Sequence, residues 1–402
     1  MLSTKPETKE VATDRPSTLP PAIIFGGYFI SLAVLEGLSR RGIPVYVLND
    51  RWAEARFSRH ARPIRLPADV PYPQSATAFL TGSASDDLKG SVLLAAGDDE
   101  LEIIAKNRDV LAEKFRLDLS NPEAQLKMLD KLATYEAAKK AGVPTPRFWQ
   151  VRSEEDIYTL RGELVYPLIV KPKVSHLFQK KFKGRFFVAK TFDQVIESFR
   201  VAENAGIATL LVEKIPGPDS RHCSYYTYLD QEGKALFDFT KRIIRRYPKN
   251  MGVASYHITD HVERVRELSL QLFREVGLQG LATAEFKLDD RDGQLKLIEC
   301  NARFTASNSL VARAGFDLGN FVYNRAVGIP QPPLTDFRVG LRQWDPLRDF
   351  RAFLELRKRG EITFPEWLAS IMHRSSIAYF SWRDPIPSLF RLWNVSKLLL
   401  RQ

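Results

Sequence analysis

Alternating apolar and polar positions predict a β-hairpin around the segment 289–293. The segment carries the Asp and Gly residues that hairpin turns favour, and strand-like alternation flanks it on both sides. Successive side chains of a strand point to opposite faces, so we expect Glu299, Asn301 and Arg303 to share one face. Pairing across the turn would bring Glu285 close to Glu299.

The polar face of this hairpin has the residue types of a metal and phosphate site. Two carboxylates and a carboxamide oxygen are hard ligands, and they suit Mg²⁺ held between protein and substrate phosphates. An arginine on the same face can meet a phosphate or a developing oxyanion with two hydrogen bonds. The same pattern also describes an amphipathic hairpin with a solvated polar face, which is common in antiparallel sheets. The rest of the chain decides between these interpretations.

The first fifty residues predict the opening of a parallel sheet. A short apolar strand at 21–25 ends at Gly26 and Gly27, a helix extends to Arg41, and a second strand occupies 43–48. This strand–helix–strand order is typical of parallel α/β sheets. The further spaced glycines of a dinucleotide fingerprint are missing, so an NAD-dependent oxidoreductase is the weaker alternative.

Another buried strand, at 91–96, ends in acidic residues. Ligands of open α/β sheets bind at the carboxyl ends of strands, which puts Asp98 and Asp99 within reach of a substrate. Capping of the helix that follows is the interpretation that we favour for both.

Basic residues recur in the middle of the chain. A helix is predicted from Lys131 to Lys140, and Lys171 lies inside an apolar strand, where an unpaired ammonium group would be costly. The loop 174–185 is basic and contains His176, which is within reach of phosphate. Further strands are expected at 209–213, 224–229 and 235–240, and a helix is expected at 259–276.

Composition narrows the classes of function. The chain has 402 residues with 59 Lys and Arg against 48 Asp and Glu, and the basic residues are spread along it. Neither a zinc-ligand spacing nor an RNA-binding aromatic motif accompanies them, so a nucleotide site is favoured over nucleic-acid binding. The two cysteines, Cys223 and Cys300, fit a reducing cytoplasm, and Cys300 is expected to pack in the core. The longest apolar runs fall short of about 18 residues, so no membrane-spanning helix is expected.

Three strings resemble the ATP-grasp superfamily, in the order of that fold. The string DKLATYEAAKKAGVPTP is similar to the helix that opens an ATP-grasp domain, YPLIVKPK to the strand with its nucleotide lysine, and AEFKLDDRDGQLKLIECNARF to its metal-binding hairpin. The resemblance covers about residues 21–330. The two opening glycines, the string AAGDDE and the basic carboxy-terminal part are most similar to predicted ATP-dependent carboxylate–amine ligases near D-aspartate ligases and carbamoyl-phosphate-synthase-like proteins.

The resemblance implies an α/β and α+β architecture. A Rossmann-like pre-ATP-grasp domain would occupy 21–125, after a lead-in at 1–20 that we expect to be disordered because it is polar and rich in Pro and Thr. A two-lobed ATP-grasp domain would follow at 126–330, with a lid subdomain at about 146–211. A helical, basic extension at 331–402 would complete the chain.

The implied activity uses ATP and Mg²⁺, with Mn²⁺ as a substitute. The enzyme would activate a carboxylate as an acylphosphate with release of ADP, and it would transfer the acyl group to an amine. Small molecules such as an amino acid or an amino sugar derivative would be the substrates. Phosphoryl transfer of this kind depends mainly on positioning and charge neutralisation.

The resemblance also assigns roles to single residues. Lys131 and Lys171 would bind the phosphates of the nucleotide. Glu213, Lys214 and Ile215 would form the hinge that contacts adenine, and Asp219 would bind the ribose hydroxyls. Glu213 is the alternative ribose ligand. The metal ligands would be Glu285, Glu299 and Asn301.

Arg303 and Arg242 would be the catalytic arginines by the same resemblance. Arg303 would stabilise the transferring phosphoryl group or the oxyanion, at the end of the hairpin. Arg242 is chosen from the basic residues that follow the strand at 235–240, where ATP-grasp enzymes often have a residue that faces phosphate or the substrate carboxylate. His257 and His261, beside the next helix, are expected to cap it or to lie at the surface.

Two features keep alternatives open. The loop that covers the phosphates in many ATP-grasp enzymes is rich in glycine, but here it holds only Gly184 among lysines and Arg185. A non-catalytic, nucleotide-dependent regulator is therefore one alternative, which the complete Glu, Asn and Arg set disfavours. A membrane-surface adaptor acting through 383–402 is another, although packing of this segment onto the body is favoured. The sequence specifies neither the two substrates nor the oligomeric state.

Overall fold

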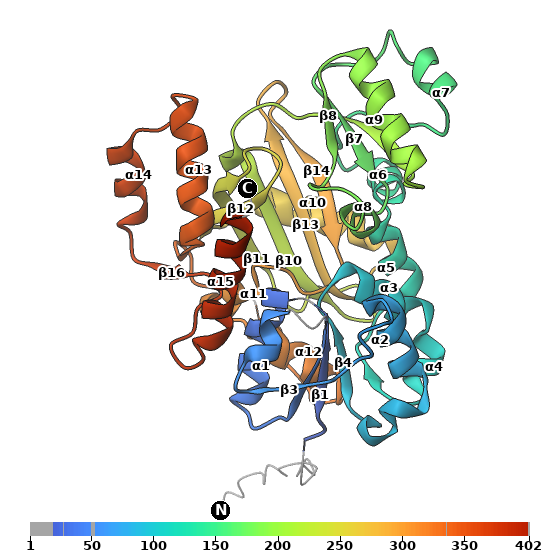
Figure 1. Ribbon diagram of the computed structural model, residues 1–402, viewed down its shortest axis with the longest axis vertical. Helices are drawn as coiled ribbons and strands as arrows, with labels where there is room; N and C mark the ends of the chain where they lie inside the picture. Colours follow the sequence, from blue (N-terminus) through green and yellow to red (C-terminus); the bar gives the residue numbers. More distant parts are fainter. Residues whose placement is uncertain (1–18, 27, 50–52, 335, 401–402) are drawn as a thin grey trace, which may run out of the picture.

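The computed structural model describes residues 19–26, 28–49, 53–334 and 336–400 of the chain. Three sheets organise these residues, and Figure 1 shows them with the first sheet at the bottom, a large central sheet above it and a small sheet at the upper right. The lead-in expected at 1–20 lies outside the described residues except for its last two.

A parallel sheet of five strands opens the fold. Its order is β3-β2-β1-β4-β5, with the bounds β1 (Ala22–Phe25), β2 (Val45–Leu48), β3 (Ala61–Pro63), β4 (Val92–Ala95) and β5 (Arg116–Leu117). The helices around it are α1 (Ser31–Ser39), α2 (Tyr72–Thr81), α3 (Asp98–Lys106) and α4 (Arg108–Ala112).

Strand β1 is apolar on both faces, and helices cover both. Ile24 packs in a cluster with α1, while Ile23 and Phe25 pack in a second cluster with α2, α3 and α4. Parallel strands that are buried on both sides become continuous apolar runs, which explains why the first strands were visible in the sequence. The predicted Rossmann-like α/β domain is confirmed.

The central sheet has seven strands in the order β14-β13-β10-β11-β12-β15-β16. Its bounds are β10 (His222–Leu229), β11 (Phe239–Tyr247), β12 (Val253–Thr259), β13 (Gly280–Asp289), β14 (Gln294–Asn301), β15 (Arg342–Trp344) and β16 (Ser375–Ile377). The helices α5 (Pro122–Leu129), α6 (Lys131–Lys140) and α10 (Glu263–Val276) pack on one face through a shared apolar cluster.

The small sheet forms a separate lobe that we call the lid. Its order is β6-β9-β7-β8, with the bounds β6 (Phe148–Gln150), β7 (Leu168–Pro172), β8 (Phe187–Ala189) and β9 (Thr209–Glu213). The lid also contains α7 (Glu154–Thr159), α8 (Ser175–Gln179) and α9 (Phe192–Asn204). Together with the central sheet, this lobe gives the two-lobed arrangement that the resemblance implied.

The carboxy-terminal extension is helical, as expected, but it also completes the central sheet. Its helices are α13 (Pro346–Lys358), α14 (Phe364–Ile371) and α15 (Ile386–Leu400), and they lie on the side of the central sheet away from the lid in Figure 1. Strand β15 pairs antiparallel with β12, and β16 pairs parallel with β15. Before the extension, α11 (Asn308–Ala314) and α12 (Leu318–Ala326) pack against α1 in a shared apolar cluster.

Two predictions for the central sheet were wrong. The strand expected at 235–240 occupies Phe239–Tyr247, so it includes the basic residues that were expected to follow it. The strand Val253–Thr259 was not predicted, and His257 lies within it rather than beside a helix start. Among the described residues, none of the helices combines the length and the apolar character needed to cross a bilayer.

Candidate active site

The predicted hairpin is confirmed, and its register places the two glutamates opposite each other. Strands β13 and β14 pair antiparallel, with Glu285 facing Glu299 and Thr283 facing Asn301. The alternation of the strand sends Cys300 into the apolar cluster beneath the sheet, as expected. The polar face of the hairpin therefore carries two carboxylates on neighbouring strands, which is the geometry that a shared cation requires.

A cavity that is open to solvent lies between this hairpin and the lid. It brings together seven of the residues predicted for nucleotide and metal binding, from five different secondary-structure elements and the segment after β9. These residues are Lys131, Lys171, Glu213, Lys214, Ile215, Glu285 and Glu299.

Lys171 and Lys131 enter the cavity from adjacent elements. The backbone N–H of Lys131, at the start of α6, donates to the carbonyl of Lys173 at 2.9 Å, which ties the helix to the end of β7. The Nζ of Lys171 donates to the hydroxyl of Tyr135 at 2.8 Å and to the carbonyl of Ile298 at 2.9 Å. Both lysines are thus held by the protein within reach of one anionic ligand.

Burial and mutual repulsion make these ammonium groups unusually acidic. Burial lowers the pKa of Lys171 to about 8, and it lowers the pKa of Lys131 to about 8 with help from the charge of Lys171. Burial alone would raise the pKa of Glu299, but the positive charges of Arg185, Lys131 and Lys171 outweigh it and hold that pKa low. The site therefore holds a cluster of positive charge that is incompletely balanced, which favours a polyanion such as a nucleotide phosphate.

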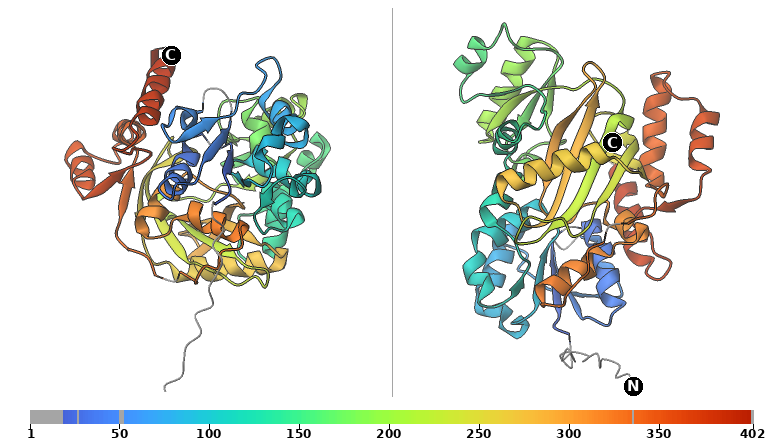
Figure 2. Two further views of the ribbon diagram at one scale, coloured as in Figure 1. Left: turned by 90° about the horizontal axis from the view of Figure 1, so that it is seen from below. Right: turned by 180° about the vertical axis from the view of Figure 1, so that it is seen from behind.

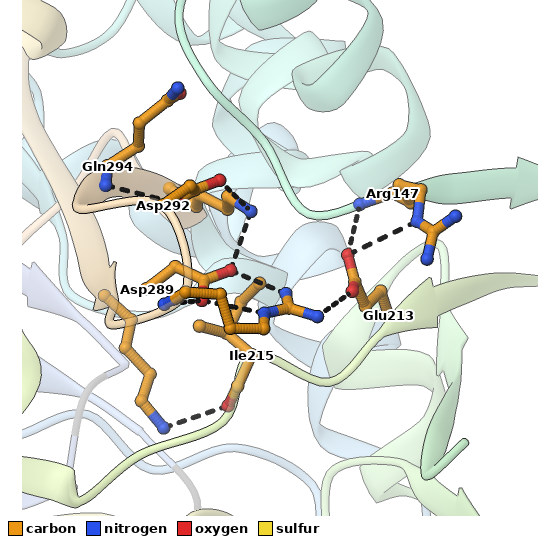
Figure 3. Close-up of polar contacts among 9 residues, drawn as sticks. Arg147, Glu213, Ile215, Asp289, Asp292 and Gln294 are labelled. Atoms are coloured by element: carbon orange, nitrogen blue, oxygen red, sulfur yellow. Dashed lines mark hydrogen bonds and ion pairs between the residues drawn. The ribbon is translucent and has the colours of Figure 1, made fainter. Parts of the chain in front are cut away.

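The predicted adenine hinge follows strand β9 along the wall of the cavity. The carbonyl of Ile215 accepts from Nζ of Lys287 at 3.1 Å, and burial lowers the pKa of Lys214. Glu213 is buried, and its carboxylate accepts from Arg291 at 2.6 Å and from the backbone N–H of Arg147 at 3.2 Å (Figure 3). The Glu213 carboxylate is thus bonded within the protein and fixes the hinge.

Asp219 lies outside the residues that line the cavity. Its carboxylate accepts from the backbone N–H of Asn250 at 3.0 and 3.2 Å and faces Nε of Arg246 at 3.8 Å. Because Arg246 and Asn250 both line the cavity, Asp219 contacts its wall from behind.

The structure contradicts the placement of Arg242. Its side chain is 49% exposed and its Nε donates to Asp260 at 2.5 Å, on the outside of β11. Irregular pairing with β12 after Ile243 shifts the strand register, so that Arg246 lines the cavity. The sequence prediction failed because it treated these residues as a loop after the strand, where the alternation of faces could not be applied.

Lys241 and His257 form a buried pair beside the hairpin. The Nζ of Lys241 lies 3.2 Å from Nδ1 of His257, and both residues are buried. Burial lowers the pKa of Lys241 to about 8, and the negative charge of Glu285 opposes this shift. His257 therefore neither caps a helix nor lies at the surface, contrary to the prediction.

Arg303 projects toward the first domain. Its Nε donates to the carboxylate of Asp98 at 2.5 Å, and its Nη1 donates to the carbonyl of Phe304 at 2.9 Å. The expected capping role of Asp98 is wrong, because helix α3 starts after Gly97 without a side-chain cap. Burial would raise the pKa of Asp98, but the guanidinium of Arg303 lowers it to about 2. Neither Arg303 nor Asn301 lines the cavity of the nucleotide-binding residues.

The glycine-poor loop 174–185 is partly helical and connects the lid to α3. His176, which was expected to be within reach of phosphate, places its Nε2 2.8 Å from the carboxylate of Glu102. Lys180 pairs with Asp99, and Arg185 lines the cavity. The first turn of α3 therefore holds the lid as well as Arg303.

Several cavity residues were missed by the sequence analysis as members of the site. They are Tyr135, Arg185, His222, Arg246 and Lys287. Lys287 had a usable signal, because it lies two residues after Glu285 on the same strand and so shares its face. The others come from a helix, a loop and two further strands, and only the tertiary fold brings them to one cavity.

The donor set fits a hard divalent cation, although the protein alone gives an incomplete shell. Among the described residues, no group of three or more His, Cys, Asp or Glu side chains is arranged to hold a metal. Glu285 and Glu299 supply two carboxylates, and the positive charges around them would hold a phosphate whose oxygens complete the coordination.

The parallel domain, the lid and the cavity over the central sheet define an ATP-grasp protein. The chain belongs to the family of the carbamoyl-phosphate synthase L chain, ATP-binding domain, whose model matches residues 130–332. It is 25% identical over 333 residues to D-aspartate ligase of Enterococcus faecium strain Aus0004, which covers 78% of each chain. It is 22% identical over 249 residues to the carbamoyl phosphate synthase large chain of Halomonas eurihalina, which covers 57% of this chain and 22% of that protein.

A solved structure shows the same fold. The biotin carboxylase domain of 2-oxoglutarate carboxylase from Hydrogenobacter thermophilus, in complex with MgADP, ADP and bicarbonate, superposes with a TM-score of 0.62. The match covers 80% of this chain and 73% of that chain at 18% sequence identity.

Proposed function

We propose that the protein is a Mg²⁺-dependent ligase that uses ATP to join a carboxylate to an amine. The observation that carries the proposal is the single cavity that joins Lys131 and Lys171 to the paired carboxylates of Glu285 and Glu299. The likeness to D-aspartate ligase over most of both chains supports ligation as the reaction. A cytoplasmic setting is part of the proposal, and the two buried, unpaired cysteines are compatible with it.

The nucleotide would bind with its phosphates toward the two lysines. Lys131 and Lys171 would each donate to phosphate oxygens, while backbone groups of Lys214 and Ile215 would contact the adenine ring. Asp219 contacts the cavity wall from behind and Glu213 is bonded to Arg291, so the ribose role assigned to them by resemblance would require these bonds to change.

The first chemical step would be phosphorylation of the carboxylate substrate. A carboxylate oxygen attacks the γ-phosphorus, the bond from that phosphorus to the bridging oxygen breaks, and ADP carries away the negative charge. A magnesium ion held by Glu285, Glu299 and Asn301 would supply neutralisation of the charge on the phosphates. Arg303, oriented by Asp98, would donate hydrogen bonds to the transferring group.

The second step would form the amide bond. The nitrogen lone pair of the amine attacks the acyl carbon, the carbon–oxygen bond to phosphate breaks, and the nitrogen loses its proton to water. Arg303 would also stabilise the oxyanion of the tetrahedral intermediate. Removal of one such preorganised donor typically reduces turnover by about 10²- to 10³-fold.

Nucleotide binding is tested first, because every later step depends on it. Titration calorimetry with ATP should give binding that strengthens when Mg²⁺ is present. Complete absence of Mg²⁺-dependent binding in folded protein would refute the proposal.

The reaction itself is tested by ADP release over a panel of carboxylates crossed with amines, with mass spectrometry of the product. In an active pair, Glu299→Gln should abolish turnover while leaving the fold intact. Asp290→Asn is the matched control, since Asp290 lies in the turn of the same hairpin and pairs with Arg221 away from the cavity. Unchanged ADP release by Glu299→Gln would contradict the metal assignment.

A further inference from the structure

The last helix of the described chain presents apolar side chains to solvent. In α15, Ile386 is 54% exposed, Leu389 is 58% exposed and Leu392 is 47% exposed. Trp382, four residues before the helix, is 88% exposed. A helix of a globular domain normally buries such residues in a core. The exposed side chains of Trp382, Ile386, Leu389 and Leu392 therefore indicate a surface that binds a partner.

The start of α15 is firmly attached to the body. Phe390 stacks on Phe57 with the ring centroids 3.9 Å apart. Arg391 donates to Asp345 at 2.7 Å, and its guanidinium lies 4.4 Å from the ring centroid of Phe29. From there the helix extends away from the body, as the view from below in Figure 2 shows. The expected packing onto the body is therefore confirmed for Phe390, but not for the exposed residues around it.

The exposed apolar residues are concentrated in the extension rather than scattered. The segment 347–393 holds more than half of the exposed large hydrophobic side chains in the described chain. Besides those of α15, its members include Phe350 and Leu354 of α13, Phe364 and Leu368 of α14, and Met372 directly after α14. Such a concentration is typical of an interaction surface.

The charge of this region identifies the kind of partner. Residues 382–402 contain four basic residues and one acidic residue, Asp384, which is buried and bonded to Ser58; one of the four, Arg391, is paired with Asp345. The whole extension 331–402 holds 12 basic against 7 acidic residues. Within the described part of the chain, the guanidinium of Arg383 has neither a salt bridge nor a hydrogen bond. A second copy of the chain would bring like charges together, whereas an anionic lipid surface matches both the apolar and the basic character.

The helix has the length of a surface-bound element. Its 15 residues extend over about 22 Å, which is shorter than the hydrocarbon core of about 30 Å. We propose that residues 382–400 dock the protein onto an anionic membrane surface, with Trp382, Leu389 and Leu392 entering the interface. The rest of the chain would stay outside the bilayer, with its ligase site available to substrates.

Co-flotation of the full-length protein with vesicles tests the proposal. One set of vesicles contains phosphatidylcholine alone, and the other contains phosphatidylcholine with phosphatidylglycerol, both at low ionic strength. We expect binding to the phosphatidylglycerol vesicles and at least about tenfold weaker binding by the double variant Leu389→Glu/Leu392→Glu. Arg383→Ala should weaken binding about fivefold, because one basic residue near an anionic surface contributes about that much.

Val201→Glu is the matched control, since Val201 is an apolar residue of α9 with 42% exposure. It should bind vesicles like the unaltered protein. Light scattering after size exclusion tests the alternative partner, which is a second copy of the chain. A dimer that the double variant dissociates, without vesicle binding, would show that a second copy covers this surface and would overturn the proposal. Failure of the unaltered protein to bind phosphatidylglycerol vesicles, or equal binding by the double variant, would overturn it as well.

Discussion

Replacement of Lys171 by methionine should separate nucleotide binding from folding. The side chain is 7% exposed, and its ammonium donates to Tyr135 and to the carbonyl of Ile298. Burial lowers its pKa from 10.5 to about 8, so keeping the charge in the folded protein costs about 3 kcal/mol at neutral pH. Because methionine has a similar length and no charge, Lys171→Met does not carry the free-energy cost of a buried ammonium group.

The loss of the two hydrogen bonds works in the opposite direction. A hydrogen bond to a charged group contributes about 1.5–3 kcal/mol. However, the Tyr135 hydroxyl itself donates to the Ile298 carbonyl at 2.9 Å, so this acceptor keeps a partner in Lys171→Met. The two effects should leave the free energy of unfolding within about 1 kcal/mol of its original value. Nucleotide affinity should fall about 10- to 100-fold, because a phosphate loses one charge-assisted contact.

Urea unfolding and titration calorimetry with ADP and Mg²⁺ measure the two quantities on the same preparations. Lys287→Met is the comparison, since Lys287 is equally buried and bonds to the carbonyls of Ile215 and Gly217 at 3.1 and 2.9 Å. No other donor to these two carbonyls is described, so Lys287→Met should lower stability clearly more than Lys171→Met does. Unchanged ADP affinity in stable Lys171→Met protein would refute the phosphate-binding role of Lys171.

The pH dependence of ADP affinity and of stability provides a second test of the role of Lys171. The ammonium groups of Lys131 and Lys171 are lost in the free protein as pH rises through about 8, so ADP affinity should decline above that pH. Stability should change in the opposite sense. Between about pH 8 and 10.5 the unfolded chain binds more protons at these lysines than the folded chain, so their contribution to the free energy of unfolding rises with pH. Lys171→Met should flatten both profiles.

Three further predictions concern neighbouring residues. Asp98→Asn should lower kcat by about tenfold or more with little change in ADP affinity, because Asp98 orients Arg303 outside the nucleotide cavity; weaker ADP binding with normal kcat, seen by calorimetry and steady-state assays, would contradict this. Arg242→Ala should leave ligase activity intact while Arg246→Ala weakens ADP binding, and the reverse result would restore the prediction made from sequence. Glu100 is buried in the first turn of α3, where its carboxyl group accepts from the hydroxyl of Tyr72 at 2.7 Å. Burial raises its pKa from 4.5 to about 7, so its contribution to stability, about 3 kcal/mol, is present below pH 4.5 and is lost as pH rises to about 7. Thermal unfolding of Glu100→Gln should show less decline in stability over this interval, and an identical decline would refute the assignment of the decline to Glu100.

The hairpin could be predicted from sequence because a strand has a period of two. The assignment of Glu285 and Glu299 to strands joined by a tight turn brought them close, but the turn alone does not set their pairing. The register that starts at Asp289 and Gln294 would place Glu285 opposite Ile298, and a register shift between Glu285 and Phe286 brings it opposite Glu299 instead. The first sheet was visible for a related reason, since strands buried on both faces form uninterrupted apolar runs. In both cases the signal is local and repeats within a few residues.

The contacts that complete the site join residues far apart in the sequence, and the sequence pattern did not predict them. Asp98 and Arg303 are 205 residues apart in sequence, and either residue alone fits a cap or a surface position. The placement of Arg242 failed for a local reason, because the strand was ended before it and the alternation that puts Lys241 and Arg242 on opposite faces was not applied. Irregular pairing after Ile243 then brings Arg246 to the cavity. Hydrophobic periodicity carries no information about either long-range pairing or strand irregularity.

The first turn of α3 contacts both Arg303, through Asp98, and the lid, through Asp99. These two ion pairs differ in how much they contribute to stability. Asp98 and Arg303 form a largely buried pair, and breaking such a pair costs about 3–5 kcal/mol. Lys180, by contrast, is 43% exposed where it pairs with Asp99, and exposed pairs contribute about 0–1 kcal/mol. The Lys180 contact can therefore break at modest cost when a nucleotide enters, while the buried His176 still contacts Glu102 of α3 and Arg303 keeps its orientation. We expect the arginine to be in place before the nucleotide arrives, and the lid to adjust around it.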